Sequence, residues 1–276
     1  MIAAAPPQTS LTSEAVRALS GLRTPKFLAT RNEEGVANVV PVLSLDAFDD
    51  RTLVFGEMMV WKTKRNLEAD ARVSVLVLAP DLRCWTIRGR FVGFERSGPR
   101  FDRVAASPDA RYNPYGSYRS AGVIEVLETA GASRVSQREL LLGTLRGRVL
   151  ARRLAAGGRP VMPVQVKEKF DRLKAVKALA CVDPDGGPHC VPAMPAVAAG
   201  RGRLVLGGAA VDAVAALPGG APLAAAVLSL EPVAYQVKGR FAGLRRSLGQ
   251  SFAVLDVLEA YSASPPLPGH LLPMKP

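Results

Sequence analysis

The stretch Ile87-Arg88-Gly89-Arg90-Phe91 recurs later in the chain as Val237-Lys238-Gly239-Arg240-Phe241. The match extends outward in both directions, with an offset of 151 residues upstream and 131 downstream, where the first copy carries an insert. Upstream, Lys26-Phe27-Leu28-Ala29 matches Lys177-Ala178-Leu179-Ala180, and downstream residues 123–128 (VIEVLE) match residues 254–259 (VLDVLE). Blocks that match in the same order along a chain indicate an internal duplication. We therefore predict two tandem copies of one domain.

Each copy has the pattern of a small antiparallel barrel. A short helix with apolar residues at helical spacing comes first, around Val16, Leu19 and Leu22 in the first copy and Val166, Phe170 and Leu173 in the second. Extended runs separated by turn residues follow, and in the first copy they cover residues 26–31, 37–45, 52–56, 73–78, 85–94 and 123–129. Six short strands with few helices predict a mainly β fold of two tandem β-barrels.

The repeat also predicts the domain boundaries. The first domain is expected over residues 1–133 and the second, with a proline-rich tail, over residues 169–276. A helical linker over 134–168 joins them, with Leu141 and Leu145 on its apolar face. The first copy carries an insert around 104–119, whose Tyr112, Tyr115 and Tyr118 belong either to a plain surface loop or to a lid over a bound ligand.

The composition narrows the class of protein. With 48% hydrophobic and 22% charged residues among 276, the chain is that of a folded globular protein. No apolar run approaches the roughly 18–20 residues that cross a bilayer, and the N-terminus lacks the pattern of a signal peptide, so we expect a cytoplasmic protein without a membrane partner. The net charge of +12 is spread along the chain without interleaved aromatic residues. We therefore predict no nucleic-acid partner.

The sequence contains little that points to side-chain catalysis or to a metal. Cys181, His189 and Cys190 are close together, but a fourth ligand is missing, so they are interpreted as residues on neighbouring strands and no metal site is predicted. No Ser-His-Asp, Cys-His or paired-carboxylate pattern is present, and no catalytic residue is assigned.

Positive charge gathers where the third extended run of the first copy, residues 52–56, meets a short helix, predicted over residues 64–69. Lys62, Thr63, Lys64 and Arg65 crowd the start of that helix. The helix dipole makes this an unfavourable place for positive charge, and a bound anion would remove the conflict and use the free backbone N–H groups. The equivalent stretch of the second copy, residues 207–217 (GGAAVDAVAAL), has no basic residue and one acid. We predict one phosphate-binding loop, in the first copy; the alternative is a solvated basic helix start.

These residues resemble a known family. The block Trp61-Lys62-Thr63-Lys64-Arg65-Asn66-Leu67, with the following Asp70-Ala71-Arg72-Val73 and Ile87-Arg88-Gly89-Arg90, is similar to the pyridoxamine 5′-phosphate oxidase-like FMN-binding split-barrel superfamily. The resemblance covers about residues 22–129 well and 174–260 as a weaker second copy. It implies that Lys62 and Thr63 bind the phosphate of FMN, that Asn66 lies just behind them, and that the strand with Val40, Pro41 and Val42 lines the isoalloxazine ring.

Family members are usually homodimers with flavin between two barrels. The resemblance therefore implies an intrachain pseudo-dimer with one flavin site per chain, and leaves open whether whole chains also form a homodimer. We predict that Lys62, Thr63, Lys64 and Asn66 hold the phosphate and that Glu57, Met58 and Trp61 lie near the ribityl chain or the ring. Met58 and Trp61 are equally consistent with core positions.

Three functions remain open at this stage. The preferred one is an FMN-dependent oxidoreductase that acts on a small-molecule substrate or redox partner, because the flavin would supply the reactivity that the side chains lack. The second is a non-catalytic module that carries flavin, deazaflavin or haem, with His189 as the candidate haem ligand. The third is a scaffold that has lost its ligand.

Overall fold

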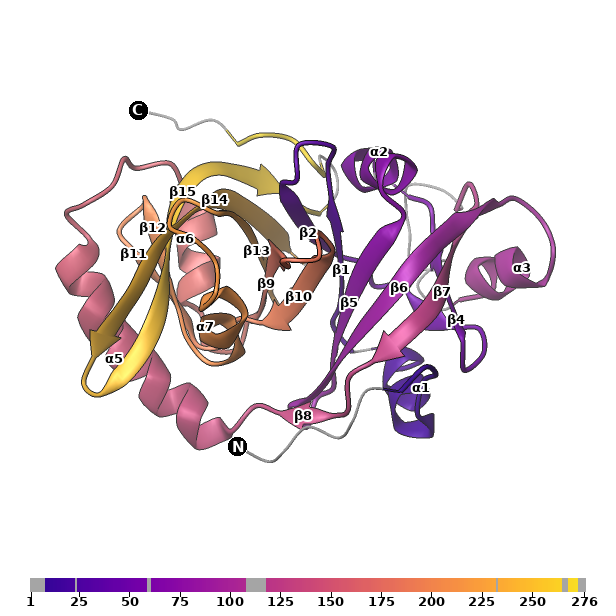
Figure 1. The fold of residues 1–276 in the computed structure, drawn as a ribbon, viewed down its shortest axis with the longest axis horizontal. Coiled ribbons are helices and arrows are strands. Elements are labelled where there is room, and N and C mark those ends of the chain that lie inside the picture. The colour runs from indigo at the N-terminus through magenta and orange to yellow at the C-terminus, as the bar shows by residue number, and fades with distance from the viewer. Residues whose placement is uncertain are drawn as a thin grey trace.

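The computed structural model describes residues 8–22, 24–58, 61–107, 118–231, 233–264 and 268–272. Two curled antiparallel sheets lie side by side, joined by a long helix (Figure 1). The first half consists of α1 (Ser13–Leu19), β1 (Lys26–Arg31), β2 (Ala37–Pro41), β3 (Asp46–Ala47), β4 (Thr52–Gly56), α2 (Trp61–Ala69), β5 (Arg72–Leu78), β6 (Arg83–Glu95), α3 (Pro99–Ala105), β7 (Ala121–Thr129) and β8 (Ser133–Arg134). The second half consists of α5 (Gln137–Leu154), α6 (Val164–Asp171), β9 (Val176–Val182), β10 (Pro188–Pro192), β11 (Ala196–Ala199), β12 (Arg203–Leu206), α7 (Ala209–Val214), β13 (Pro222–Leu228), β14 (Ala234–Ser247) and β15 (Gln250–Ser262).

The two sheets have the same strand order. The first runs β2-β1-β5-β6-β7-β4-β3, with β8 paired to β6, and the second runs β10-β9-β13-β14-β15-β12-β11. Each strand of the first path therefore has a counterpart at the same place in the second. The helices α2 and α7 also correspond, because each follows the strand that pairs with the last long strand of its sheet. The chain is mainly β and consists of two tandem split barrels, as the sequence predicts.

The repeated motif with Gly89 and Gly239 forms a bulge in each barrel. The pairing of β6 with β7 shifts register between Arg88 and Gly89, and the pairing of β14 with β15 shifts between Lys238 and Gly239. A Cβ on Gly89 would lie 2.8 Å from a backbone oxygen of β7, and one on Gly239 would lie 1.9 Å from a backbone oxygen of β15. The motif needs glycine because the neighbouring strand leaves no room for a side chain.

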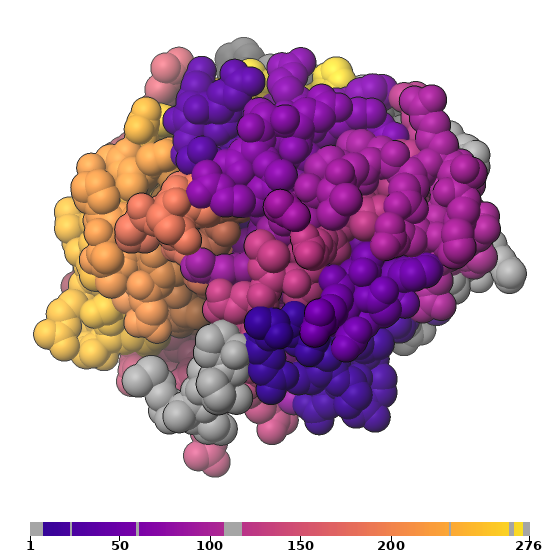
Figure 2. Space-filling model, turned by 45° about the vertical axis from the view of Figure 1, so that its right-hand side comes forward, coloured from indigo at the N-terminus to yellow at the C-terminus, as the bar shows by residue number. Residues whose placement is uncertain are grey.

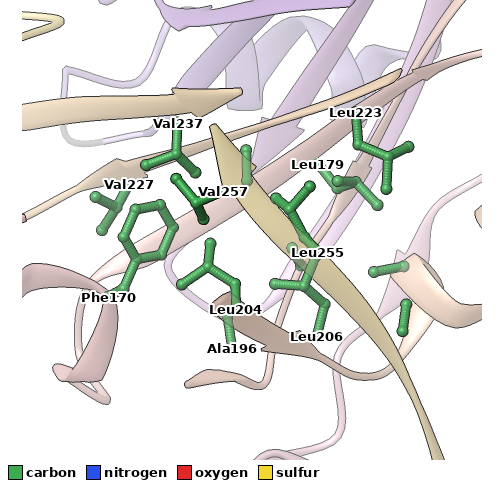
Figure 3. Packing of buried hydrophobic residues seen from close by; sticks show 14 of the residues in the cluster. Phe170, Leu179, Ala196, Leu204, Leu206, Leu223, Val227, Val237, Leu255 and Val257 are labelled. Carbon is green, nitrogen blue, oxygen red and sulfur yellow. The ribbon is translucent and has the colours of Figure 1, made fainter. Parts of the chain in front are cut away.

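Each barrel encloses its own apolar core. In the second barrel Phe170, Leu204 and Leu255 converge from α6, β12 and β15 (Figure 3). In the first barrel the core includes Phe55 and Trp85, both at most 1% exposed. Alternating residues along each strand supply these two interiors, which is why the strands need apolar side chains at every second position.

A third apolar cluster joins the barrels through a pseudo-two-fold contact. The strand β2 packs on β9, β13 and β14, while its counterpart β10 packs on β1, β5 and β6. The Gln236 side chain on β14 donates a hydrogen bond to the backbone oxygen of Val39 at 2.6 Å, and its counterpart Thr86 on β6 donates to that of Cys190 at 3.2 Å. Reciprocal contact between equivalent patches defines a two-fold arrangement. The chain is therefore an intrachain pseudo-dimer, and its halves form one continuous body (Figure 2).

The structure differs from the sequence prediction in two places. The helix α5 packs on the second barrel through Gly143, Gly147 and Leu150, whereas Leu141 and Leu145 are exposed. The cause is close approach: a Cβ on Gly143 would lie 2.7 Å from a ring carbon of Pro195, so glycine instead of leucine faces the barrel.

The insert of the first barrel contributes a core residue. Tyr118 is only 7% exposed and packs with Val54 and Val104, so it belongs to the barrel and not to a lid. Residues 108–117, with Tyr112 and Tyr115, lie outside the described residues. Of the three tyrosines proposed for a lid, Tyr118 is therefore excluded.

Candidate functional site

The predicted phosphate-binding residues lie on α2, which begins three residues earlier than expected. Because the helix starts at Trp61, residues Lys62, Thr63 and Lys64 belong to its first turn and not to the preceding loop. The backbone N–H groups of a first turn have no partner within the helix. This turn therefore combines free donors, a favourable dipole and two ammonium groups.

Thr63 and Asn66 are one helical turn apart and both face the barrel. Their exposed fractions are 2% and 6%. The Asn66 Nδ2 donates to Thr30 Oγ1 at 3.0 Å, and Asn38 Nδ2 donates to Thr63 Oγ1 at 3.4 Å. These two side chains therefore hold α2 against the first barrel, and of the two residues only Thr63, in the first turn, has a backbone N–H without a partner in the helix.

The buried polar contacts continue into the second barrel. Gln236 Nε2 donates to Asn38 Oδ1 at 3.1 Å as well as to the Val39 backbone oxygen. The network thus runs from Thr63 through Asn38 to Gln236. Buried polar groups are costly unless they are paired, so this network fixes α2 in a defined position relative to β14.

Lys62 contacts the second barrel directly. Its Nζ lies 3.5 Å from the ring centroid of Tyr261 on β15, a cation–π contact. Tyr261 in turn donates its hydroxyl proton to Glu259 at 2.7 Å. Burial and the neighbouring Lys238 ammonium lower the pKa of Lys62, while Glu259 opposes that effect.

Lys238 on β14 completes this group. Burial lowers the pKa of Lys238 below its ordinary value, and Glu259 again acts in the opposite direction. Two ammonium groups from different barrels therefore share one nearby carboxylate, next to the start of α2. A bound anion between them would stabilise both charged forms.

The remaining predicted contacts surround Glu57. Lys64 Nζ donates to Glu57 Oε1 at 2.6 Å, and Ser120 donates to the other carboxylate oxygen. Burial acts to raise the pKa of Glu57, but these hydrogen bonds outweigh it and leave the pKa below its ordinary value. Glu57 is thus an ionised carboxylate that forms an ion pair with Lys64.

Trp61 and Met58 take different positions near the start of α2. Trp61 is 60% exposed and its ring lies 5.0 Å from the Arg119 guanidinium, so it is a surface residue and not part of a core. Met58 packs against the cluster that contains Tyr118. From the sequence, each of these two residues could have been either a site residue or a core residue. The structure places them in different environments.

The predicted ring-lining strand is β2. Val42 is buried in the core of the first barrel, and Val40 packs against the same core. Pro41 is half-buried at the end of the strand. Any contact of this strand with a flavin ring would therefore come mainly from its backbone.

The sequence missed the residues that the second barrel contributes, namely Gln236, Lys238 and Tyr261. Lys238 was visible as part of the repeated motif, but nothing in the sequence indicated that it faces Lys62. His189, the candidate haem ligand, lies on β10 beside α7 and not among the side chains around Lys62.

Comparison with known proteins concerns the fold. The chain is similar in structure to an FMN-binding protein from Syntrophomonas wolfei (TM-score 0.38, 18% identity, covering 45% of this chain and 87% of that one). It is also similar to HupZ from Group A Streptococcus (TM-score 0.37, 19% identity, 43% and 91% covered) and to an F420 reductase (TM-score 0.34, 21% identity, 44% and 98% covered). The fold is a tandem split barrel. No protein-family model and no curated protein matches the sequence of this tandem split barrel.

Two further properties bear on the class of site. Within the described ranges there is no group of three or more histidine, cysteine or acidic side chains placed to hold a metal ion. Of the helices in those same ranges, none has the length and apolar character needed to span a bilayer.

Proposed function

We propose that the tandem split barrel binds one flavin phosphate per chain, as FMN, where α2 of the first barrel meets β14 and β15 of the second. The observation that carries this proposal is the convergence of Lys62 and Lys238, from different barrels, at the first turn of α2. Phosphate is an acceptor of several hydrogen bonds and carries two negative charges near neutral pH. The ammonium groups and the first-turn N–H groups are donors of the matching kind.

The donor set fits a flavin phosphate better than it fits a metal or a neutral ligand. Thr63 and Asn66 position the helix, Lys62 and Lys238 supply charge, and Trp61, at the start of the same helix, is exposed. The isoalloxazine would supply hydride or single-electron transfer, which no side-chain arrangement in the site provides. The chain's own role is to bind the phosphate, to hold the barrels around the cofactor and to limit access of water.

We further propose an oxidoreductase function with a small-molecule substrate or redox partner. A carrier of flavin or deazaflavin remains the competing proposal, because the same cationic turn suits the phosphate of either cofactor. The two proposals differ in turnover, because an oxidoreductase catalytically oxidises or reduces a substrate and a carrier does not.

The test starts with the purified full chain. Its visible spectrum is recorded, the protein is denatured, and the released chromophore is identified and quantified by mass spectrometry. One FMN per chain is the expected result. A colourless protein that also fails to bind added FMN would overturn the proposal, and a released deazaflavin would replace FMN by the competing cofactor.

The oxidoreductase part needs its own measurement. The flavin-loaded chain is mixed anaerobically with NADH or NADPH, and the loss of the oxidised flavin absorbance is followed. Reduction that is faster than that of free FMN under the same conditions supports an enzyme. NADH, NADPH and small molecules that were first reduced with dithionite are each tested as electron donors. If every donor reduces bound and free FMN at the same rate, only cofactor binding remains supported.

A further inference from the structure

The second barrel contains a cavity at the position equivalent to the proposed flavin site. It is an open pocket with a volume of about 700 Å³ and lies between α7, β10 and Arg88 of the first barrel. Its apolar wall is formed by Val191, Ala213 and Ala216. Ligand pockets in proteins span about 300–1,000 Å³ and combine such a wall with a few polar groups.

The cavity exists because α7 carries short side chains where α2 carries long ones. With Gly207 aligned to Gly56, Ala213 takes the position of Lys62 and Ala216 takes that of Arg65. Arg88, on the other barrel, takes the position of Lys238 in the repeated motif. The two sites are thus related by the pseudo-two-fold axis, but the second has lost both the bulk and the charge of its helix.

The charge of this cavity is the reverse of that of the first site. Asp183, Asp185 and Asp212 line it, and Arg88 is its one basic lining residue. Arg88 donates hydrogen bonds to both Asp183 and Asp185, to the latter at 3.2 Å. Because one guanidinium faces three carboxylates, the lining has an excess of negative charge in a chain whose net charge is +12.

The other charged groups nearby do not remove this excess. Arg72 donates to the backbone oxygen of Asp185 at 3.0 Å, but its guanidinium is already paired with Asp70 at 2.8 Å. Asp212 has no ion pair within the part of the chain that the structure describes. Its carboxylate on α7 therefore stays available to a ligand.

His189 adds a buried atom that lacks a partner. Its Nδ1 is buried without a hydrogen bond, and the nearest carboxylate oxygen, on Asp183, lies 3.6 Å away. Asn38 occupies the same place in the first site and is paired with Thr63, whereas Val214 stands at the position of Thr63 here. His189, the polar residue beside the cavity, therefore lacks the side-chain partner that Thr63 provides to Asn38 in the first site.

We propose that this cavity binds a small organic cation, an amine or amidinium joined to an apolar body. Asp212 receives the cationic group, the carboxylates of the β9–β10 turn that are paired with Arg88 add to the negative potential, and the alanines of α7 contact the apolar body. The site is distinct from the flavin site in ligand charge, and it does not depend on whether flavin binds to α2.

The test uses three probes of the same shape and different charge. Benzylamine, benzyl alcohol and benzoate are titrated into the full chain by isothermal calorimetry at low ionic strength. We expect saturable binding of one benzylamine per chain, at least tenfold weaker binding of benzyl alcohol and no binding of benzoate. Equal affinity for the amine and the alcohol, or no saturable binding of the amine, would overturn the proposal.

Variants then assign the binding to this cavity. Asp212→Asn should weaken benzylamine binding about tenfold, and Ala213→Leu should weaken it by narrowing the pocket against α7, with unchanged flavin content in both. Asp50→Asn, in an exposed turn of the first barrel, is the matched control and should bind benzylamine as the natural chain does. Unchanged binding in both cavity variants, or two FMN molecules per chain with one displaced by Ala213→Leu, would refute the assignment.

Discussion

Replacement of Lys62 by methionine tests the proposed phosphate site most directly. Methionine keeps most of the length and the apolar stem of lysine, so packing beside Tyr261 is kept while the charge and its cation–π attraction are removed. A hydrogen bond to a charged group contributes roughly 1.5–3 kcal/mol. Because Lys62 is exposed to solvent, we take the lower end, which corresponds to an approximately tenfold weaker affinity for FMN.

Lys238→Met should weaken FMN binding by at least as much, because Lys238 is the more buried of the two ammonium groups. Lys64→Met should have a smaller effect, since Lys64 is already paired with Glu57 at 2.6 Å. Lys174→Met, an exposed lysine next to α6, is the matched control for loss of one positive charge. Affinities are measured by titration of flavin fluorescence.

Riboflavin separates phosphate binding from ring binding. It lacks the phosphate, so Lys62→Met and Lys238→Met should change its affinity by less than about twofold, which is about 0.4 kcal/mol against about 1.4 kcal/mol for a factor of ten. The pKa of Lys62 is lowered by burial and by Lys238. As the pH rises, Lys62 therefore loses its charge earlier than a lysine with an ordinary pKa, and FMN affinity should begin to fall at a correspondingly lower pH. If the two variants weaken FMN and riboflavin equally, or leave FMN binding unchanged, the two lysines do not hold the phosphate.

Three further predictions concern stability and are measured by urea unfolding. Gly239→Ala should destabilise the chain by about 1–3 kcal/mol, because its Cβ would lie 1.9 Å from a backbone oxygen, whereas Gly219→Ala, with no atom within 4 Å, should change little; equal effects would refute the steric argument. Gln236→Leu should cost about 1–3 kcal/mol, because it leaves buried partners in the first barrel unpaired, and a neutral result would mean that this network does not hold the barrels together. Burial lowers the pKa of Lys177 from 10.5 to about 8, so between these pH values the unfolded chain binds more protons and the free energy of unfolding should rise with pH by up to about 3 kcal/mol. Lys177→Met should lack that rise, and identical pH profiles for the two chains would contradict it.

The two pseudo-equivalent sites that we propose differ in charge although they lie on the same fold. The barrels share strand order, bulges and the reciprocal contact through β2 and β10. What differs is the short helix: α2 has Lys62 and Thr63 where α7 has Ala213 and Val214. In the two proposed sites the preferred ligand charge would therefore differ through a few positions, without a change of the fold.

Much of the fold followed from local features of the sequence. Three features of the sequence are properties of single strands and their immediate neighbours. They are the repeated glycine at Gly89 and Gly239, the alternation of apolar residues along the strands and the turn residues between the strands. They were sufficient to predict two barrels of the same type. The gathering of basic residues around Lys62 was likewise visible, because charge near a helix start is a local feature.

Contacts between segments far apart in the chain were decided only by the tertiary structure. That Thr63 and Asn66 face the barrel depends on where α2 begins, and that Lys238 and Tyr261 meet Lys62 depends on how one barrel docks on the other. The acidic cavity beside α7 likewise needs Arg88 from the first barrel. The sequence determined what each strand and helix is, because those preferences are local. The docking of the barrels selected which side chains meet, because it is the sum of many apolar contacts that no single segment specifies.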